Sequence, residues 1–225
     1  MYGKSTRWIK EYIVSGKINK IIMDIEKLYE EACLIESDIY KHLPILKKYA
    51  ENCNHVTEMG ARGGMSTRAF LYANPNKFIS YDYQYSTPEP HLVESVNSLI
   101  KILEEAKIQG VDCEYIGKDV LNVEIDKTDM LFIDTWHCYS QLKEELRLHG
   151  KKVSKYIAFH DTHLYGEQGE GYPSMDINHP NRNKMSGEGG ILKAIYEFLD
   201  QNPEWTVDYK TDDNNGLIVI KNTKN

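Results

Sequence analysis

From His55 onward, short apolar runs alternate with stretches of helical periodicity, and this alternation constrains the fold more than any other feature. The runs with strand character are residues 55–59, 77–81, 113–116, 129–133 and 156–159. The helical stretches are residues 66–72, 90–109, 139–148 and 191–199. Strands that alternate with helices are typical of a parallel sheet covered by helices on both faces. The sequence therefore predicts a doubly wound, mostly parallel α/β fold.

The two ends of the chain add features that a plain α/β sheet lacks. Residues 205–209 and 217–220 read as two further strands with Asn-Gly at the turn between them, which predicts an antiparallel hairpin. Residues from about 17 to 51 carry apolar side chains at helical spacing, and Pro44 interrupts them or sits in the first turn of their last helix. We expect a helical extension over 1–52 and one α/β domain over 53–225.

Composition excludes several classes of protein. The formal net charge of −7 disfavours a nucleic-acid partner. No apolar run has the length of a membrane span or the form of a secretory signal. The four cysteines form no CxxC pair and no disulfide framework. These features predict a cytoplasmic protein without a membrane partner; its N-terminal helices could pack on the sheet or on a second copy of the chain.

Polar residues follow the predicted strands at the edge where ligands bind in open α/β sheets. After the first strand, the spacing is Glu58-x-Gly60-x-x-x-Gly64-x-Ser66. A dinucleotide fingerprint would need GxGxxG, but Arg62 and Met65 occupy its other two glycine positions. The spacing resembles motif I of class I methyltransferases that use S-adenosylmethionine (SAM). That family also closes its sheet with an antiparallel hairpin.

The resemblance implies roles for the acids after the next two strands. Asp82 stands where the family binds the ribose hydroxyls, and a carboxylate can accept from both hydroxyls at once. Asp119 stands where the family meets the adenine amine. Glu58, Gly60, Ala61 and Ser66 would face the methionine half. The full set of expected cofactor-binding residues is Glu58, Gly60, Ala61, Arg62, Gly64, Ser66, Asp82, Asp119 and Asp134.

Two further polar clusters follow the fourth and fifth strands. Asp134-Thr-Trp-His137 and His160-Asp161-Thr-His163 should meet at one edge, because neighbouring parallel strands end together. Two carboxylates and one imidazole can hold Mg²⁺ or Mn²⁺. These clusters and their separation resemble the cephalosporin hydroxylase family and related metal-dependent sugar and macrolide O-methyltransferases.

That second resemblance implies that Asp134, His160 and Asp161 are the metal ligands. The chain departs from the family at His160, where relatives more often carry Asp or Glu, and this admits Mn²⁺ beside Mg²⁺. The long polar segment 165–188 is expected to be a substrate lid. Aromatic residues near the edge could line an acceptor pocket: Trp136, Tyr139, Tyr165 and Tyr172.

The resulting hypothesis is a metal-dependent O-methyltransferase that acts on a sugar or another small diol. The expected base is His137 or His163, or Asp134 from the metal shell. One alternative is a metal-independent methyltransferase with a histidine base. Others are a non-catalytic SAM-binding protein and a nicotinamide oxidoreductase, which the glycine spacing opposes.

Overall fold

The computed structural model describes residues 24–83, 90–171 and 189–224. The strands are β1 (His55–Met59), β2 (Lys77–Asp82), β3 (Asp112–Gly117), β4 (Thr128–Ile133), β5 (Val153–His160), β6 (Trp205–Thr211) and β7 (Leu217–Asn222). The α-helices are α1 (Ile25–Leu34), α2 (Leu43–Ala50), α3 (Met65–Tyr72), α4 (Pro90–Ile108), α5 (Tyr139–His149) and α6 (Ile191–Gln201). Short 3₁₀ helices are η1 (Tyr40–His42), η2 (Val120–Asn122) and η3 (Gly150–Lys152).

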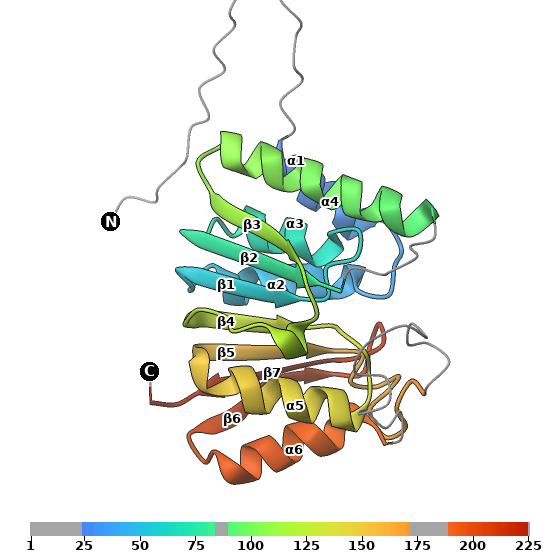
Figure 1. The fold of residues 1–225 in the computed structure, drawn as a ribbon, viewed down its shortest axis with the longest axis vertical. Coiled ribbons are helices and arrows are strands. Elements are labelled where there is room, and N and C mark those ends of the chain that lie inside the picture. The colour runs from blue at the N-terminus through green and yellow to red at the C-terminus, as the bar shows by residue number, and fades with distance from the viewer. Residues whose placement is uncertain (1–23, 84–89, 172–188, 225) are drawn as a thin grey trace, which may run out of the picture.

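One seven-stranded sheet organises the molecule, in the order β3-β2-β1-β4-β5-β7-β6 (Figure 1). The pairs from β3 to β5 are parallel, whereas β7 is antiparallel to both β5 and β6. This arrangement confirms the predicted mostly parallel fold with its closing hairpin. Because β1, β4 and β5 are adjacent and parallel, the polar residues that follow them lie together at the carboxyl ends of the strands.

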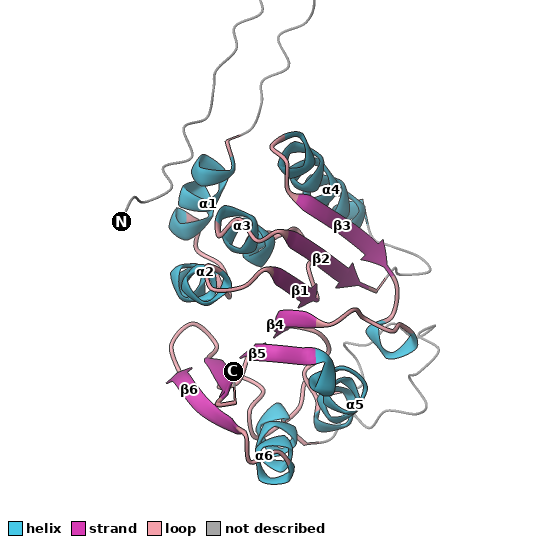
Figure 2. Ribbon diagram, turned by 90° about the vertical axis from the view of Figure 1, so that its left-hand side faces the viewer, coloured by secondary structure: helices cyan, strands magenta, loops and turns pink. Residues whose placement is uncertain are grey.

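Two hydrophobic cores lie on the two faces of the sheet. Side chains of α1, α2, α3 and α4 form one core, and those of α5 and α6 belong to the other. Figure 2 shows α1, α2 and α3 on one side and α5 and α6 on the other. The apolar strands are buried on both faces, as expected for a sheet that has helices packed on each side.

The N-terminal helices pack directly on the first core. Asp24 caps α1 by accepting a hydrogen bond from the Glu26 amide at 3.0 Å. Pro44 lies in the first turn of α2, where a missing amide hydrogen is tolerated. Leu43 and Leu46 of α2 are fully buried. The expected helix before residue 24 lies outside the described residues, and the division at residue 52 stays a prediction.

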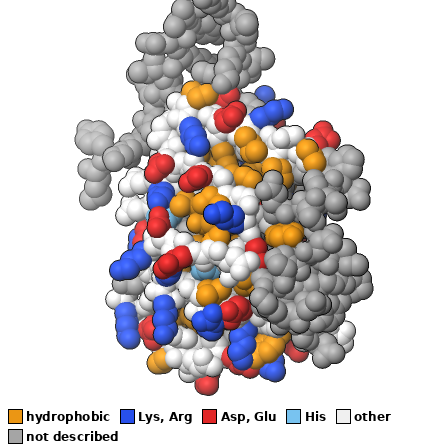
Figure 3. All heavy atoms as spheres, viewed as in Figure 1, with side chains coloured by type: hydrophobic (Ala, Val, Ile, Leu, Met, Phe, Trp, Pro, Cys, Tyr) orange, Lys and Arg blue, Asp and Glu red, His pale blue; other side chains and the backbone are white. Residues whose placement is uncertain are grey.

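The face viewed in Figure 3 carries acidic and basic side chains of both signs, intermixed with hydrophobic ones. In α4, Val93, Ile100 and Ile108 are exposed. Within the described ranges, no helix has both the length and the apolar character of a membrane span.

Candidate active site

The turn after β1 is held by the strands beside it. Gly60 has φ +87°, and its amide donates to the Tyr81 carbonyl at 2.8 Å. A Cβ at Gly60 would lie 1.8 Å from the carbonyl oxygen of Asp134. The close approach of β1 and β4 therefore requires glycine here, independently of any cofactor. Gly64 has φ +76° and precedes the first residue of α3.

Glu58 lies inside the protein rather than at the surface of the edge. Its carboxylate is fully buried and accepts hydrogen bonds from Ser66 at 2.5 Å, Thr67 at 2.7 Å and Ser80 at 2.7 Å. Burial raises the pKa of Glu58 to about 7, although these hydroxyls favour the ionised form. Both Glu58 and Ser66, expected to face the methionine half of SAM, thus join β1 to α3 and β2 through their side chains.

Asp82, at the end of β2, supports the turn after β1. Its Oδ2 accepts from the amides of Ala61 at 3.0 Å and Arg62 at 2.7 Å. Burial raises the pKa of Asp82, and the amide hydrogen bonds oppose that effect. The Arg62 guanidinium extends to the Asp38 carboxylate at 3.0 Å.

Asp119 acts locally as a helix cap. Its Oδ1 accepts from the Leu121 amide at 2.9 Å, and its Oδ2 accepts from the Asn122 side chain at 2.8 Å. These contacts fix the short helix η2 after β3. A role for Asp119 at an adenine ring stays a prediction.

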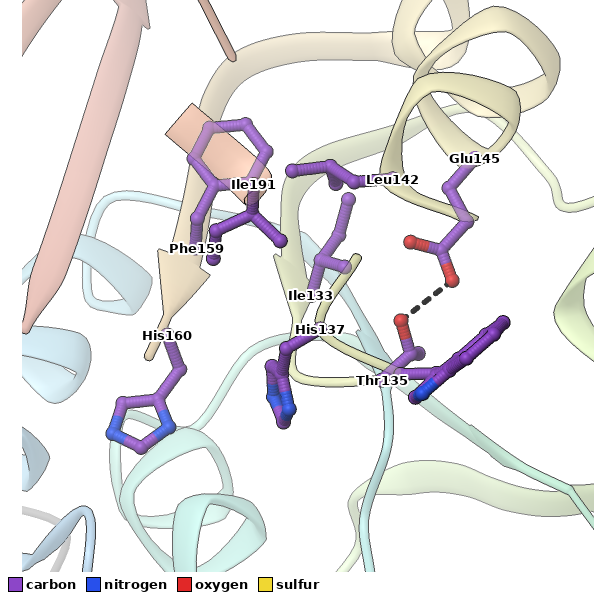
Figure 4. A pocket seen from close by; sticks show the side chains of 9 residues that line it. Ile133, Thr135, His137, Leu142, Glu145, Phe159, His160 and Ile191 are labelled. Atoms are coloured by element: carbon purple, nitrogen blue, oxygen red, sulfur yellow. Dashed lines mark hydrogen bonds between the residues drawn. The ribbon is translucent and has the colours of Figure 1, made fainter. Parts of the chain in front are cut away.

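A compact cluster of ionisable groups lies at the ends of β4 and β5. The Nε2 of His137 is 3.1 Å from Asp134 Oδ1 and 3.0 Å from Asp161 Oδ2. The Nδ1 of His160 is 3.3 Å and 3.5 Å from the same two oxygens. Figure 4 shows both imidazoles projecting to the same side of this edge. The structure thus brings together the three predicted ligands and His137.

The outward nitrogen of each imidazole has an acceptor from another part of the chain. His160 Nε2 lies 3.0 Å from the Asp38 carbonyl, which precedes η1. His137 Nδ1 lies 2.9 Å from the Glu170 carboxylate. The Tyr165 ring stacks on His137 with a centroid separation of 5.0 Å and an interplanar angle of 11°. Both rings are therefore fixed in orientation.

The charges in this cluster stabilise one another. Burial lowers the pKa of His137, but its hydrogen bonds to Asp134 and Glu170 outweigh burial and raise the pKa to about 10. For His160, the charge of Asp134 outweighs burial and raises the pKa to about 10. Burial raises the pKa of Asp134, but the two histidines hold it well below its usual range. Positive charge between the carboxylates is therefore strongly favoured.

Asp161 provides the observation most suggestive of a ligand. Its φ is +58°, in a region that non-glycine residues seldom adopt, and its side chain is only 7% exposed. Its buried Oδ1 has no hydrogen-bond partner among the described residues. Ligand atoms of Asp134, His137 and Asp161 all lie within 4.8 Å of one another. Oxygen and imidazole donors at such spacing fit a divalent cation.

His163 does not join this cluster. Its side chain is 63% exposed, and its Nδ1 lies 3.9 Å from Asp212 beside the hairpin turn. Tyr139 points its hydroxyl at the Glu197 carboxylate, at 2.8 Å. Tyr172 and the remainder of the expected lid, residues 172–188, lie outside the described residues.

A small pocket lies behind the two imidazoles. Apolar residues of β4, α5, β5 and α6 line it together with the buried carboxylate of Glu145 (Figure 4). Glu145 accepts from Thr135 at 2.6 Å and from Gln141 at 2.8 Å, while its Oε2 has no partner within the described residues. Burial raises the pKa of Glu145 to about 7.

Sequence reasoning missed the residues that orient the imidazoles. Glu170 lies between Gly169 and Gly171 in an aperiodic polar segment, and Asp38 contributes a main-chain carbonyl. A main-chain acceptor leaves no residue-type signal. For Glu170, the one indication in the sequence was that an acidic residue lies in the polar segment expected beside the cluster.

Comparison with known proteins places the fold. No protein-family model matches the chain, and a search of curated proteins gave no match. An O-methyltransferase from Bacillus cereus, solved with S-adenosylhomocysteine (SAH), is 14% identical, with 90% of this chain and 93% of that chain covered and a TM-score of 0.57. The O-methyltransferase TomG from Streptomyces achromogenes, solved with SAM, is 15% identical, with coverages of 91% and 92% and a TM-score of 0.57.

A third solved structure extends the comparison. The N-terminal domain of EvdMO1, determined in the presence of SAH and D-fucose, is 14% identical, with coverages of 89% and 97% and a TM-score of 0.50. Sequence identities this low establish the architecture alone. Together with the strand order and closing hairpin, they show that this chain has the fold of class I SAM-dependent methyltransferases.

Proposed function

We propose that this protein is a SAM-dependent O-methyltransferase that uses a divalent cation to bind a sugar or another small diol. The observation that carries this proposal is the convergence of Asp134, Asp161, His137 and His160 at the ends of β4 and β5. The cluster lies beside the turn after β1, because Gly60 and Asp134 are in direct contact.

The residues at the carboxyl ends of β1 and β2 support SAM binding. Solved proteins with this architecture hold SAM or SAH. In this chain, Asp82 fixes the amides of Ala61 and Arg62. We infer that the turn after β1 binds the methionine half, with Asp82 beside the ribose and Asp119 beside the adenine. Glu58 and Ser66 contribute by holding that turn on α3.

The cation would be held by Asp134, His160 and Asp161, together with His137. Mn²⁺ suits this set better than Mg²⁺, since imidazole is a softer ligand than the oxygens that Mg²⁺ prefers. A bound cation lowers the pKa of an acceptor hydroxyl and orients neighbouring acceptor oxygens. The unpartnered Oδ1 of Asp161 supports this assignment, because a buried carboxylate oxygen without a partner is costly.

The remaining chemistry is alignment and proton removal. Methyl transfer needs the acceptor oxygen in line with the sulfonium methyl, which a rigid strand edge can provide. Among the three predicted bases, His163 lies at the surface and His137 directs its Nε2 at two carboxylates. We therefore assign proton acceptance to the Asp134 carboxylate; because its pKa is held low, most of the driving force must come from the cation lowering the pKa of the acceptor hydroxyl.

The test is SAH formation from SAM over a panel of sugars and diols, with the metal-free protein, with Mn²⁺ and with EDTA. Transfer to a diol that requires Mn²⁺ is the expected result. Transfer that is undiminished in EDTA would contradict the cation. Absence of SAM binding in calorimetry would contradict the function as a whole.

A further inference from the structure

We propose that Glu170 is a positioning residue that turns the Nε2 of His137 toward the cation site and thereby makes the site selective for Mn²⁺ over Mg²⁺. This inference rests on the cation of the proposed function. It concerns a residue outside both polar clusters of the sequence, contributed by the segment that follows β5.

Three polar contacts join Glu170 to His137. Its Oε2 accepts from the Nδ1 of His137 at 2.9 Å and lies 3.3 Å from the His137 amide nitrogen. The Glu170 amide donates to the His137 carbonyl at 2.8 Å. Tyr165, from the same segment, covers one face of the ring. The two main-chain contacts hold Glu170 beside His137, and the imidazole cannot rotate or exchange its two nitrogens without losing the hydrogen bond from Nδ1 and the stacking on Tyr165.

A histidine binds a metal ion as the neutral imidazole, and because Glu170 holds the hydrogen on Nδ1, the lone pair of that neutral ring is on Nε2. That nitrogen, Nε2, lies about equally close to Asp134 and Asp161, at 3.1 Å and 3.0 Å. These two oxygens favour positive charge beside Nε2, which a proton supplies in the metal-free protein and a bound cation would supply in its place. A cation satisfies all three groups at once.

His160 repeats the arrangement from the opposite side. The Asp38 carbonyl can only accept, so the hydrogen on His160 lies on Nε2 and its Nδ1 faces the same carboxylates. When both rings are neutral, as metal binding requires, two imidazole nitrogens and two carboxylates therefore face one centre. Mg²⁺ prefers an all-oxygen octahedron, whereas Mn²⁺ also accepts imidazole, so the orientation of the rings determines the preference.

The experiment measures metal binding to the full chain without any acceptor. Free Mn²⁺ is titrated by electron paramagnetic resonance, and imidazole nitrogen coordination is detected by electron spin-echo modulation. Glu170→Ala should weaken Mn²⁺ binding about 10–100-fold, the usual effect of losing the outer partner of a ligating histidine. Glu170→Gln, which retains an acceptor for Nδ1–H, should restore part of that loss. The matched control is Glu167→Ala, an exposed acid on the same segment.

The outcomes separate this inference from the proposed function. The expected result is nitrogen coupling in the parent, loss of one coupled nitrogen in Glu170→Ala, and displacement of Mn²⁺ only by excess Mg²⁺. Equal Mn²⁺ affinity in Glu170→Ala and the parent would overturn the inference. So would a parent that binds no Mn²⁺ or shows no nitrogen coupling. Thermal unfolding checks that Glu170→Ala is folded. If that variant does not fold, the Mn²⁺ affinity of Glu170→Gln decides the question. Failure of methyl transfer with intact Mn²⁺ results would count against the acceptor chemistry alone.

Discussion

The candidate site lies along the carboxyl ends of β1 to β5, here called the functional edge, and its two halves use acidic residues in opposite ways. At the ends of β1, β2 and β3, the carboxylates of Glu58, Asp82 and Asp119 accept hydrogen bonds from hydroxyls and amides nearby. At the ends of β4 and β5, Asp134 and Asp161 face imidazoles, and Asp161 retains a buried oxygen without a described partner. The first half stabilises the shape of the edge, and the second presents charge.

This difference shows why a carboxylate at a strand end is ambiguous evidence for a ligand. The same residue type at equivalent positions braces a turn in one half and creates a strong local field in the other. The number of protein hydrogen-bond donors within reach distinguishes the two cases.

The largest expected effect is on the fold, in the first half. Gly60→Ala places a methyl 1.8 Å from the Asp134 carbonyl at a positive φ. Strain and overlap each cost about 1–3 kcal/mol, so the free energy of unfolding should fall by about 2–6 kcal/mol. Urea denaturation measures this. Gly63→Ala is the control, because its Cβ would lie 3.8 Å from Ser95. A stable Gly60→Ala protein would show that β1 and β4 can separate.

In the second half, the largest effect should be on activity. Asp161→Asn keeps a side chain that tolerates the positive φ but removes the negative charge of the carboxylate. We expect methyl transfer to fall by at least about 100-fold, more than the ~10–100-fold effect of losing a ligand's outer partner. Calorimetry should give an unchanged affinity for SAM. Retained turnover, or a parallel loss of SAM binding, would show that the two halves are not separable.

A smaller effect concerns pH, through one buried acid in each half. The pKa values of Glu58 and Glu145 are both raised to about 7 from an ordinary value of 4.5. Each therefore contributes stability that is present in full below pH 4.5 and is lost as the pH rises to about 7. Each can contribute a slope of up to about 1.4 kcal/mol per pH unit.

The corresponding variants are Glu58→Gln and Glu145→Gln, with unfolding free energies measured from pH 4.5 to 7. Each substitution should flatten the decline, and the double variant should flatten it further. Unchanged slopes in both single variants would mean that these carboxylates ionise normally inside the protein.

The smallest effect is expected at His163. Its imidazole is 63% exposed and lies beside Asp212. Substitutions at such positions typically change the free energy of unfolding by at most about 0.5 kcal/mol. Since His163 also lies outside the cluster, His163→Ala should keep turnover within about twofold. Steady-state kinetics with the best diol acceptor provides the measurement. A loss beyond tenfold would extend the functional edge to the hairpin turn.

The sequence predicted the elements and the clustering of the candidate site residues because both depend on local patterns. Apolar runs with helical spacing between them defined the strands, and parallel order then placed Asp134 near Asp161. The partners of those residues were harder to predict. Glu58 looks like a ligand until the hydroxyls of Thr67 and Ser80 are placed around it, and these come from different elements.

The groups that orient the imidazoles were beyond reach for a related reason. Glu170 belongs to a segment without periodicity, so no pattern fixed its distance from His137. Asp38 acts through its carbonyl, which every residue possesses. Contacts of this kind depend on the tertiary path of irregular segments, for which side-chain identity carries little information.

The position of β7 has a consequence for the order of assembly during synthesis. Residues 217–220 are fully buried, and Leu217 pairs with His160 across the β5–β7 ladder. A ribosome must therefore make residue 222 before β5 acquires its second neighbour and β6 joins the sheet. Until then β5 is an open edge that can pair with other chains. The half of the sheet that carries Asp134, His160 and Asp161 should consequently mature last, and nascent chains stalled before β7 should be prone to pairing with other chains.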